Sequence, residues 1–169
     1  MRFADDKTAR GGFTLVEILI TLAILGILLT IAVGNFGGLN EKYKVEAETK
    51  QLYADLMDAR GRATQRDRIS FVQVNDNGYK TFEDTNPVPD GDGNLTVGDT
   101  QVADVTVNHQ IITTGGLSDF RFNRNGIASV TGFIRFSSTA QPDYDCITIT
   151  ATRIKMGQYD ATGNTCAEK

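Results

Sequence analysis

The stretch that decides the fold reads Gly11-Gly12-Phe13-Thr14-Leu15-Val16-Glu17 and opens an apolar segment that continues to Val33. Glu17 carries the only ionisable side chain between Phe13 and Val33. The segment lies near the N-terminus behind a short polar leader. It is long enough to cross a bilayer as a helix, which takes about 20 apolar residues. We therefore expect a transmembrane helix over residues 13–39.

Three ordinary explanations of this segment fit it poorly. A secretory signal peptide has an apolar core of about 7–15 residues and then a small-residue cleavage site. This run is longer, and Gly34-Asn35-Phe36-Gly37-Gly38 follows it. A buried helix of a soluble domain is rarely so apolar over such a length. A plain membrane anchor leaves Glu17 unexplained, because a charge within the hydrocarbon costs roughly 2.5–3.5 kcal/mol.

A carboxylate inside the membrane needs a cationic partner, and the sequence has no Lys, Arg or His between Phe13 and Asn40. Cleavage after Gly12 would supply one, because Phe13 would then carry a free α-amine. Residues four apart share a helix face, so this amine can meet Glu17 of its own helix. It can equally meet Glu17 of a neighbouring subunit. The pattern thus indicates a helix that is processed, retained and packed in a helical bundle.

The stretch from Gly12 to Glu17, with the apolar run after it, resembles the prepilin signature of type IV pilins and type II secretion pseudopilins. The resemblance implies that residues 1–12 are a leader. It implies that a prepilin peptidase cuts between Gly12 and Phe13 and methylates Phe13, and that Glu17 guides docking into the filament. One departure is Gly34, because pilins often carry proline near the end of this run.

The resemblance also implies a location and a set of partners. The protein would be a single-pass protein of the inner membrane with a cytoplasmic leader and a periplasmic C-terminal domain. It would meet the inner-membrane assembly platform and then join other pilin or pseudopilin subunits in a pilus or pseudopilus. We therefore expect a minor pilin or pseudopilin that serves as a structural subunit.

The chain has 169 residues, which suits one soluble domain beside the apolar segment. Residues 40–66 predict an amphipathic helix, because apolar or small residues recur every three or four positions among charged ones. This stripe consists of Val45, Thr49, Leu52, Leu56, Ala59 and Ala63. If the helix continues from Phe13, the Gly-rich stretch 34–38 is its weak point, since glycine costs about 1 kcal/mol relative to alanine.

Residues 67–169 predict a β-rich domain. The segments with strand-like composition are 69–74, 79–82, 102–107, 109–113, 120–122, 132–136 and 146–150. Residues 83–101 are rich in Asp, Gly, Pro and Asn and predict a long surface loop. The fold class is therefore α+β. A long N-terminal helix, transmembrane in its first half and amphipathic in its second, packs on an antiparallel β-sheet domain, as in the pilin fold.

Three further stretches resemble the GspH/FimT group of minor pilins and pseudopilins. They are Ala59-Arg60-Gly61-Arg62-Ala63, Phe122-Asn123-Arg124-Asn125-Gly126 and Ile147 to Lys155. That group often ends in a Gly-Arg-x-Arg motif, and some of its members bind DNA during uptake. DNA uptake through Arg153 and Lys155 is therefore the alternative function. Here Thr152-Arg153-Ile154-Lys155 replaces the motif, lysine lacks the bidentate phosphate contact of arginine, and the net charge is −4. We expect no nucleic-acid partner.

The two cysteines are Cys146 and Cys166, both in the last quarter of the chain. A disulfide is permitted if this domain lies outside the cytoplasm, and two unpaired thiols are the alternative. We favour the bond because these are the only two cysteines and both lie near the C-terminus. It would close a loop of about 20 residues and stabilise the fold by about 3 kcal/mol on the chain-entropy model.

The stretch from Asp90 to Asp99 partly fits a calcium-binding loop. Asp90 and Asp92 fall at ligand positions three and five, Asp99 falls at position twelve, and Asn94 lies between them. Val88 occupies position one, where a ligand is required, and Asp and Gly also form ordinary turns. Two alternatives stay open: a Ca²⁺ site at these four residues, or a loop without a cofactor.

No pattern in the sequence indicates an enzyme. His109 is the only histidine, and no zinc spacing or phosphate-binding glycine loop accompanies it. A catalytic histidine also needs partner groups within reach. We interpret His109 as structural and expect a filament subunit without catalytic residues.

Overall fold

The computed structural model describes residues 12–169, with the backbone alone described for residues 31–38. The predicted leader, apart from Gly12, lies outside the described residues. The chain divides into two compact units between Leu39 and Asn40.

One helix, α1 (Leu15–Gln65), occupies the first third of the described chain. Thr14 caps its N-terminus, because the Thr14 hydroxyl accepts the backbone N–H of Glu17 at 3.2 Å. Glu17 lies in the first turn and Arg62 in the last, which are the charges that a helix dipole favours at those ends. The backbone stays helical over residues 34–38, where the glycines led us to expect the weak point.

Within the part of the chain that the structure describes, no helix is long and apolar enough to cross a membrane. The prediction of a transmembrane first half of α1 therefore finds no confirmation here.

The first sheet has the strand order β3-β2-β1-β5. Its strands are β1 (Ser70–Asn75), β2 (Gly78–Glu83), β3 (Thr100–Thr106) and β5 (Asp119–Phe122). All pairs are antiparallel, and β1 and β2 form a hairpin with Asn75 opposite Gly78. The hairpin turn consists of Asp76 and Asn77, and the predicted loop between β2 and β3 is confirmed.

The second sheet has the order β4-β6-β7-β8-β9. Its strands are β4 (Ile111–Thr113), β6 (Gly132–Phe136), β7 (Cys146–Ile149), β8 (Ile154–Asp160) and β9 (Thr165–Glu168). The sequence did not predict β8 or β9, and His109 lies in a bend before β4 rather than in a strand. The sequence of β8 shows only a weak strand pattern, because Gly157 interrupts it. That glycine is required, since a Cβ there would collide with the backbone oxygen of Ala167 in β9.

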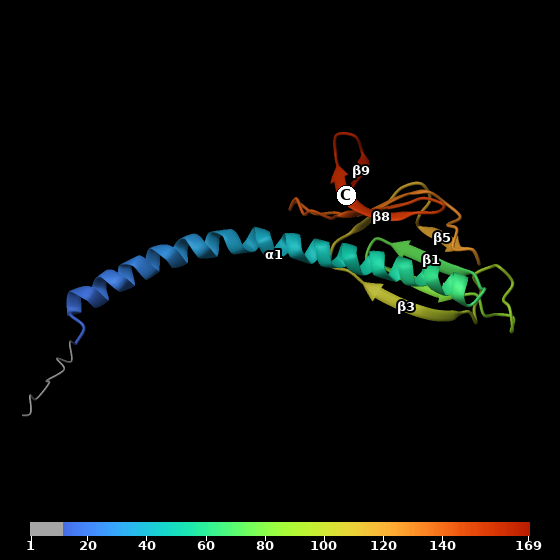
Figure 1. Ribbon diagram of the computed structural model, residues 1–169, viewed down its shortest axis with the longest axis horizontal. Helices are drawn as coiled ribbons and strands as arrows, with labels where there is room; N and C mark the ends of the chain where they lie inside the picture. The colour runs from blue at the N-terminus through green and yellow to red at the C-terminus, as the bar shows by residue number, and fades with distance from the viewer. Residues whose placement is uncertain (1–11) are drawn as a thin grey trace, which may run out of the picture. The chain divides into compact units, whose positions relative to one another are not determined.

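The C-terminal half of α1 supplies the centre of the core. Its stripe from Val45 to Ala63 is buried as predicted, with Leu52 and Leu56 fully covered. The stripe joins side chains of both sheets, among them Phe122 and Ile147. Burying each large apolar side chain stabilises the fold by about 1.5–3 kcal/mol. In Figure 1 this part of α1 lies along the sheet that contains β1 and β3, so the α+β class is confirmed.

Candidate processing and assembly site

The backbone from Gly12 to Thr14 is not helical and leads directly into α1. Phe13 is 81% exposed, and a Cβ placed on Gly12 would meet no atom within 4 Å. The peptide bond between Gly12 and Phe13 is therefore open to solvent on both sides. An enzyme that cuts a peptide needs such an accessible, extended segment, because a helical segment buries its own carbonyls in hydrogen bonds.

Glu17 is placed by the cap at the start of α1. Thr14 and Glu17 have the spacing of a capping box, in which the first residue caps the helix and the fourth adds a carboxylate. The structure shows the Thr14 half of this motif, with the Glu17 N–H bonded to the hydroxyl. The Glu17 side chain is exposed. Glu17 thus stands one helical turn from the Gly12–Phe13 peptide bond, with an exposed side chain.

The helix around Glu17 presents a continuous apolar surface. Its large apolar side chains from Phe13 to Leu29 are 46–81% exposed in the single chain. Apolar patches of this extent on a protein mark contact with another protein or with lipid. Glu17 carries the only charged side chain among these exposed apolar residues.

In the C-terminal unit, His109 joins two glutamates of α1. Its Nδ1 lies 2.7 Å from Oε2 of Glu48 and its Nε2 lies 2.7 Å from Oε1 of Glu41. Glu48 also accepts the backbone N–H of Asn108 at 2.8 Å. The three side chains form a histidine cluster that fixes the turn between β3 and β4 to the helix. His109 is thus structural, as expected.

The cluster changes the acidity of its members. Burial lowers the pKa of an imidazole, but the hydrogen bonds to Glu41 and Glu48 outweigh it, so the pKa of His109 is raised. Burial raises the pKa of Glu48, but the Asn108 N–H and the His109 ring outweigh it, so that pKa is lowered. Sequence reasoning missed both glutamates. Their spacing of seven residues, which places them on one helix face, was the available signal.

A buried carboxylate ties the end of α1 to β2. Glu83 is 2% exposed, and its two oxygens accept from Arg62 at 3.3 Å and from Arg66 at 2.6 Å. A buried charge is costly unless it is paired and hydrogen-bonded. Part of the arginine-rich stretch around Ala59 to Ala63 therefore has a structural role, because Arg62 neutralises a charge inside the domain.

Cys146 of β7 and Cys166 of β9 form a disulfide, with their Cα atoms 6.0 Å apart. The bond crosses β8 and closes the last three strands into one unit. This is the disulfide that we favoured from the sequence.

The residues of the expected calcium loop make other contacts in the structure. Asp99 accepts backbone N–H groups from Thr85, Asn86 and Thr96 at 2.7–3.0 Å. Burial raises the pKa of a carboxyl, but these three donors outweigh it and lower the pKa of Asp99. Asp92 caps the N–H of Asn94, and Asp90 is exposed. In residues 12–169 no three acidic, histidine or cysteine side chains gather in a way that could hold a metal ion.

The pair Arg153 and Lys155 does not form a basic strand face. Arg153 lies in the turn before β8, where its backbone pairs with Thr150. Lys155 lies on β8 and pairs with Glu168 of β9. The two residues therefore do not share one strand face, because the strand begins only at Ile154. Of the two basic residues, Lys155 is neutralised by Glu168.

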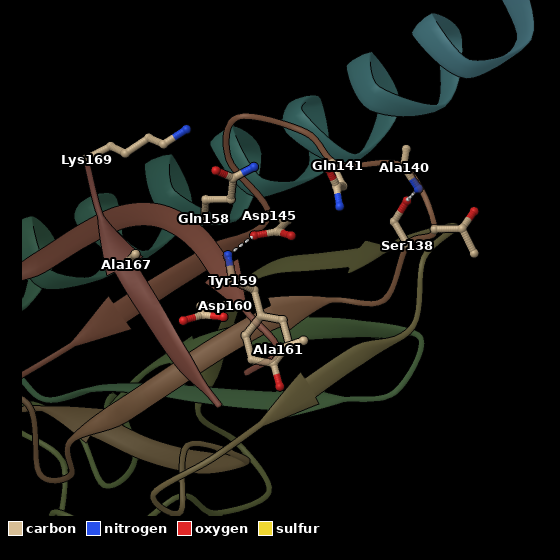
Figure 2. A pocket seen from close by; sticks show the side chains of 11 residues that line it. Ser138, Ala140, Gln141, Asp145, Gln158, Tyr159, Asp160, Ala161, Ala167 and Lys169 are labelled. Carbon is tan, nitrogen blue, oxygen red and sulfur yellow. Dashed lines mark hydrogen bonds between the residues drawn. The ribbon is translucent and has the colours of Figure 1, made fainter. Parts of the chain in front are cut away.

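A groove of about 500 Å³ lies between the loop 138–145 and the hairpin of β8 and β9. Figure 2 shows the Asp145 carboxylate at its wall, where it accepts the backbone N–H of Tyr159 at 2.6 Å. Burial raises the pKa of Asp145. The lining residues include Gln158 and Lys169. They also include Asp160, which adds a second carboxylate to the groove.

Comparison with known proteins matches two family models. Residues 7–33 match the prokaryotic N-terminal methylation motif, and residues 48–152 match type II transport protein GspH. No curated protein matches the chain, and no solved structure matches it. The first match covers Gly12, Phe13, Thr14 and Glu17. The second covers most of the C-terminal unit, including Glu48 and His109 of the histidine cluster but not Glu41.

Proposed function

Because this chain belongs to the family of type II transport protein GspH, whose members are structural pilin-type subunits, we propose how it is processed and assembled. A prepilin peptidase cuts between Gly12 and Phe13 and methylates the new amine of Phe13. The apolar segment then holds the protein in the inner membrane, with the C-terminal unit on the periplasmic side. From there the subunit enters a pilus or pseudopilus as a minor component.

This proposal rests on two features that occur together in one chain: a methylation motif and an exposed apolar helix that carries Glu17. The methylation motif at residues 7–33 contains an exposed, non-helical Gly12-Phe13 bond. The helix that starts two residues later presents an apolar surface with one carboxylate, that of Glu17. A filament core of packed helices would cover this surface. The amine released on Phe13 would then neutralise Glu17 in the same subunit or in the next one.

The methylated α-amine explains why Glu17 is tolerated among apolar residues. An unpaired carboxylate in a low-dielectric bundle is strongly disfavoured, whereas one that meets a cation at hydrogen-bonding distance is stabilised. Docking would therefore favour subunits that have already been cleaved, since only they carry the amine. The charge pair links processing to assembly.

Processing is tested on the protein purified from the cells that produce it. Mass spectrometry should find a methylated Phe13 as the first residue. Gly12→Val should block cleavage, because a branched side chain fills the open space beside the scissile bond. Gly11→Val is the matched control and should be cleaved normally. A mature chain that begins after residue 36 would show an ordinary signal peptide and end the proposal.

A further inference from the structure

The loop between β2 and β3 contains the sequence Asn94-Leu95-Thr96. Asparagine followed two positions later by Thr or Ser, with no proline between, is the acceptor pattern for N-linked glycosylation. None of the other asparagines in the sequence has Ser or Thr at this spacing. The pattern predicts a glycan only where the asparagine is exposed and there is space for the sugar.

Asn94 meets the requirement for exposure. Its side chain is exposed, and its amide nitrogen has one long contact, 3.4 Å to the backbone oxygen of Asp92. Its backbone is fixed instead, because the Asn94 N–H donates to the Asp92 carboxylate at 2.8 Å. The loop beneath it is held by Asp84, which accepts the N–H of Asp92 at 3.1 Å and of Gly93 at 2.8 Å. The loop therefore presents a loosely held carboxamide on a rigid base.

There is also room beside this carboxamide for a sugar. Asn94 lines a groove of about 450 Å³ that continues over β5 and includes Asp119, Arg121 and Ser129. Arg121 also donates to the backbone oxygen of Gly93, which joins the loop to the groove floor. A carboxylate, a guanidinium and a hydroxyl offer both donors and acceptors to the hydroxyl groups of a first sugar residue.

We propose that Asn94 is an N-glycosylation site. The proposal rests on the proposed function, because the modification requires that the C-terminal unit leave the cytoplasm. The donor is a sugar carried on a lipid diphosphate. The Asn94 amide nitrogen bonds to the anomeric carbon of that sugar, while the bond from this carbon to the diphosphate oxygen breaks. The lipid diphosphate leaves with the bonding electron pair, and one amide proton passes to a base of the transferase.

The contacts of Thr96 in the folded loop favour transfer before folding. In the folded loop the Thr96 hydroxyl donates to Asp99 at 3.3 Å and accepts from the Asn86 amide at 3.2 Å. A transferase that reads this hydroxyl must act before these bonds form. The glycan is therefore added to the emerging chain, and folding then draws Thr96 into the loop while Asn94 stays outside.

The experiment uses the full chain purified from the cells in which it is naturally made. The peptide Thr81–Arg121, released by trypsin, should carry a mass increment of sugar residues on Asn94. Asn94→Gln and Thr96→Val should abolish the increment, whereas Thr96→Ser should keep it. Asn125→Gln is the matched control, since Asn125 is exposed in a turn but has Ile127 two positions later.

An unmodified Asn94 in the wild-type peptide would overturn the proposal, and so would an increment that survives Asn94→Gln. The first residue of the mature chain, read from the same sample, separates the two proposals. A chain that starts at Phe13 with an unmodified Asn94 removes the glycan and leaves the proposed function intact. A chain that keeps Met1 removes the proposed processing as well.

Discussion

Nε2 of His109 lies 2.7 Å from Oε1 of Glu41, which joins the turn after β3 to a helix 68 residues earlier in the chain. The other ring nitrogen contacts Glu48 at the same distance. A ring that touches a carboxylate at each nitrogen is most favourable as an imidazolium, which donates to both. The domain is therefore held by a charge that depends on pH.

The first prediction concerns this pH dependence. Folding raises the pKa of His109 above its ordinary value of 6.5. Its contribution is therefore complete below pH 6.5 and is lost as the pH rises through the folded-state pKa. His109→Gln should lower the free energy of unfolding of residues 40–169 by about 1–3 kcal/mol at pH 6, and by much less at pH 9. Urea unfolding at the two pH values measures this.

At acidic pH the stability of the domain depends on the charge of Glu48. Its pKa is lowered from 4.5, so its contribution is present above pH 4.5 and is lost as the pH falls through the lowered folded-state pKa. Asn125→Gln, in an exposed turn, serves as the control and should change the free energy of unfolding at neither acidic nor alkaline pH. An equal effect of His109→Gln at pH 6 and pH 9 would contradict a charged histidine.

The second prediction separates assembly from cleavage. Glu17→Ala should leave cleavage at Phe13 almost unchanged, because the scissile bond lies a full helical turn away. It should reduce incorporation into filaments at least tenfold, because the amine of Phe13 loses its partner. Immunoblots of sheared filaments and of whole cells measure the two steps. Wild-type incorporation of the Glu17→Ala subunit would show that the carboxylate is dispensable.

The third prediction concerns the bond between Cys146 and Cys166. Peptide mapping without reductant should recover the two cysteines in one linked pair. Replacing both with serine should destabilise the C-terminal unit by about 3 kcal/mol, as the entropy of a 20-residue loop predicts. Complete alkylation of both thiols in the unreduced protein would exclude the bond.

The fourth prediction concerns DNA. Lys155 is neutralised by Glu168, and the sequence has a net charge of −4. We expect residues 40–169 to bind duplex DNA no more tightly than the non-specific range, with a Kd of roughly 10⁻⁴–10⁻⁶ M near physiological salt. Titration of labelled duplex at two salt concentrations tests this. Submicromolar binding that Arg153→Ala abolishes would make DNA uptake the leading function.

Local pattern was sufficient for several parts of this protein. The stripe from Val45 to Ala63 follows the period of a helix, and its burial follows from that period because one face of a helix meets one surface. The hairpin at Asp76-Asn77-Gly78 depends on turn residues that are adjacent in the chain. The methylation motif is likewise local, since Gly12, Phe13 and Glu17 lie close together in the chain.

The remaining features depend on groups that are distant in the sequence, which only the tertiary structure brings together. β8 contains Gly157 and has a weak strand pattern in the sequence. It is a strand because its backbone pairs with β7 on one side and β9 on the other. Asp99 looks like a metal ligand in the sequence, but the folded loop surrounds it with three N–H donors, and these satisfy its charge. His109 has no partner nearby in the chain, and its two glutamates become neighbours only when α1 packs beside the turn after β3. The sequence alone determined which residues form the helix and the hairpin. Packing decided which charges are paired, because electrostatic contacts depend on distance in space.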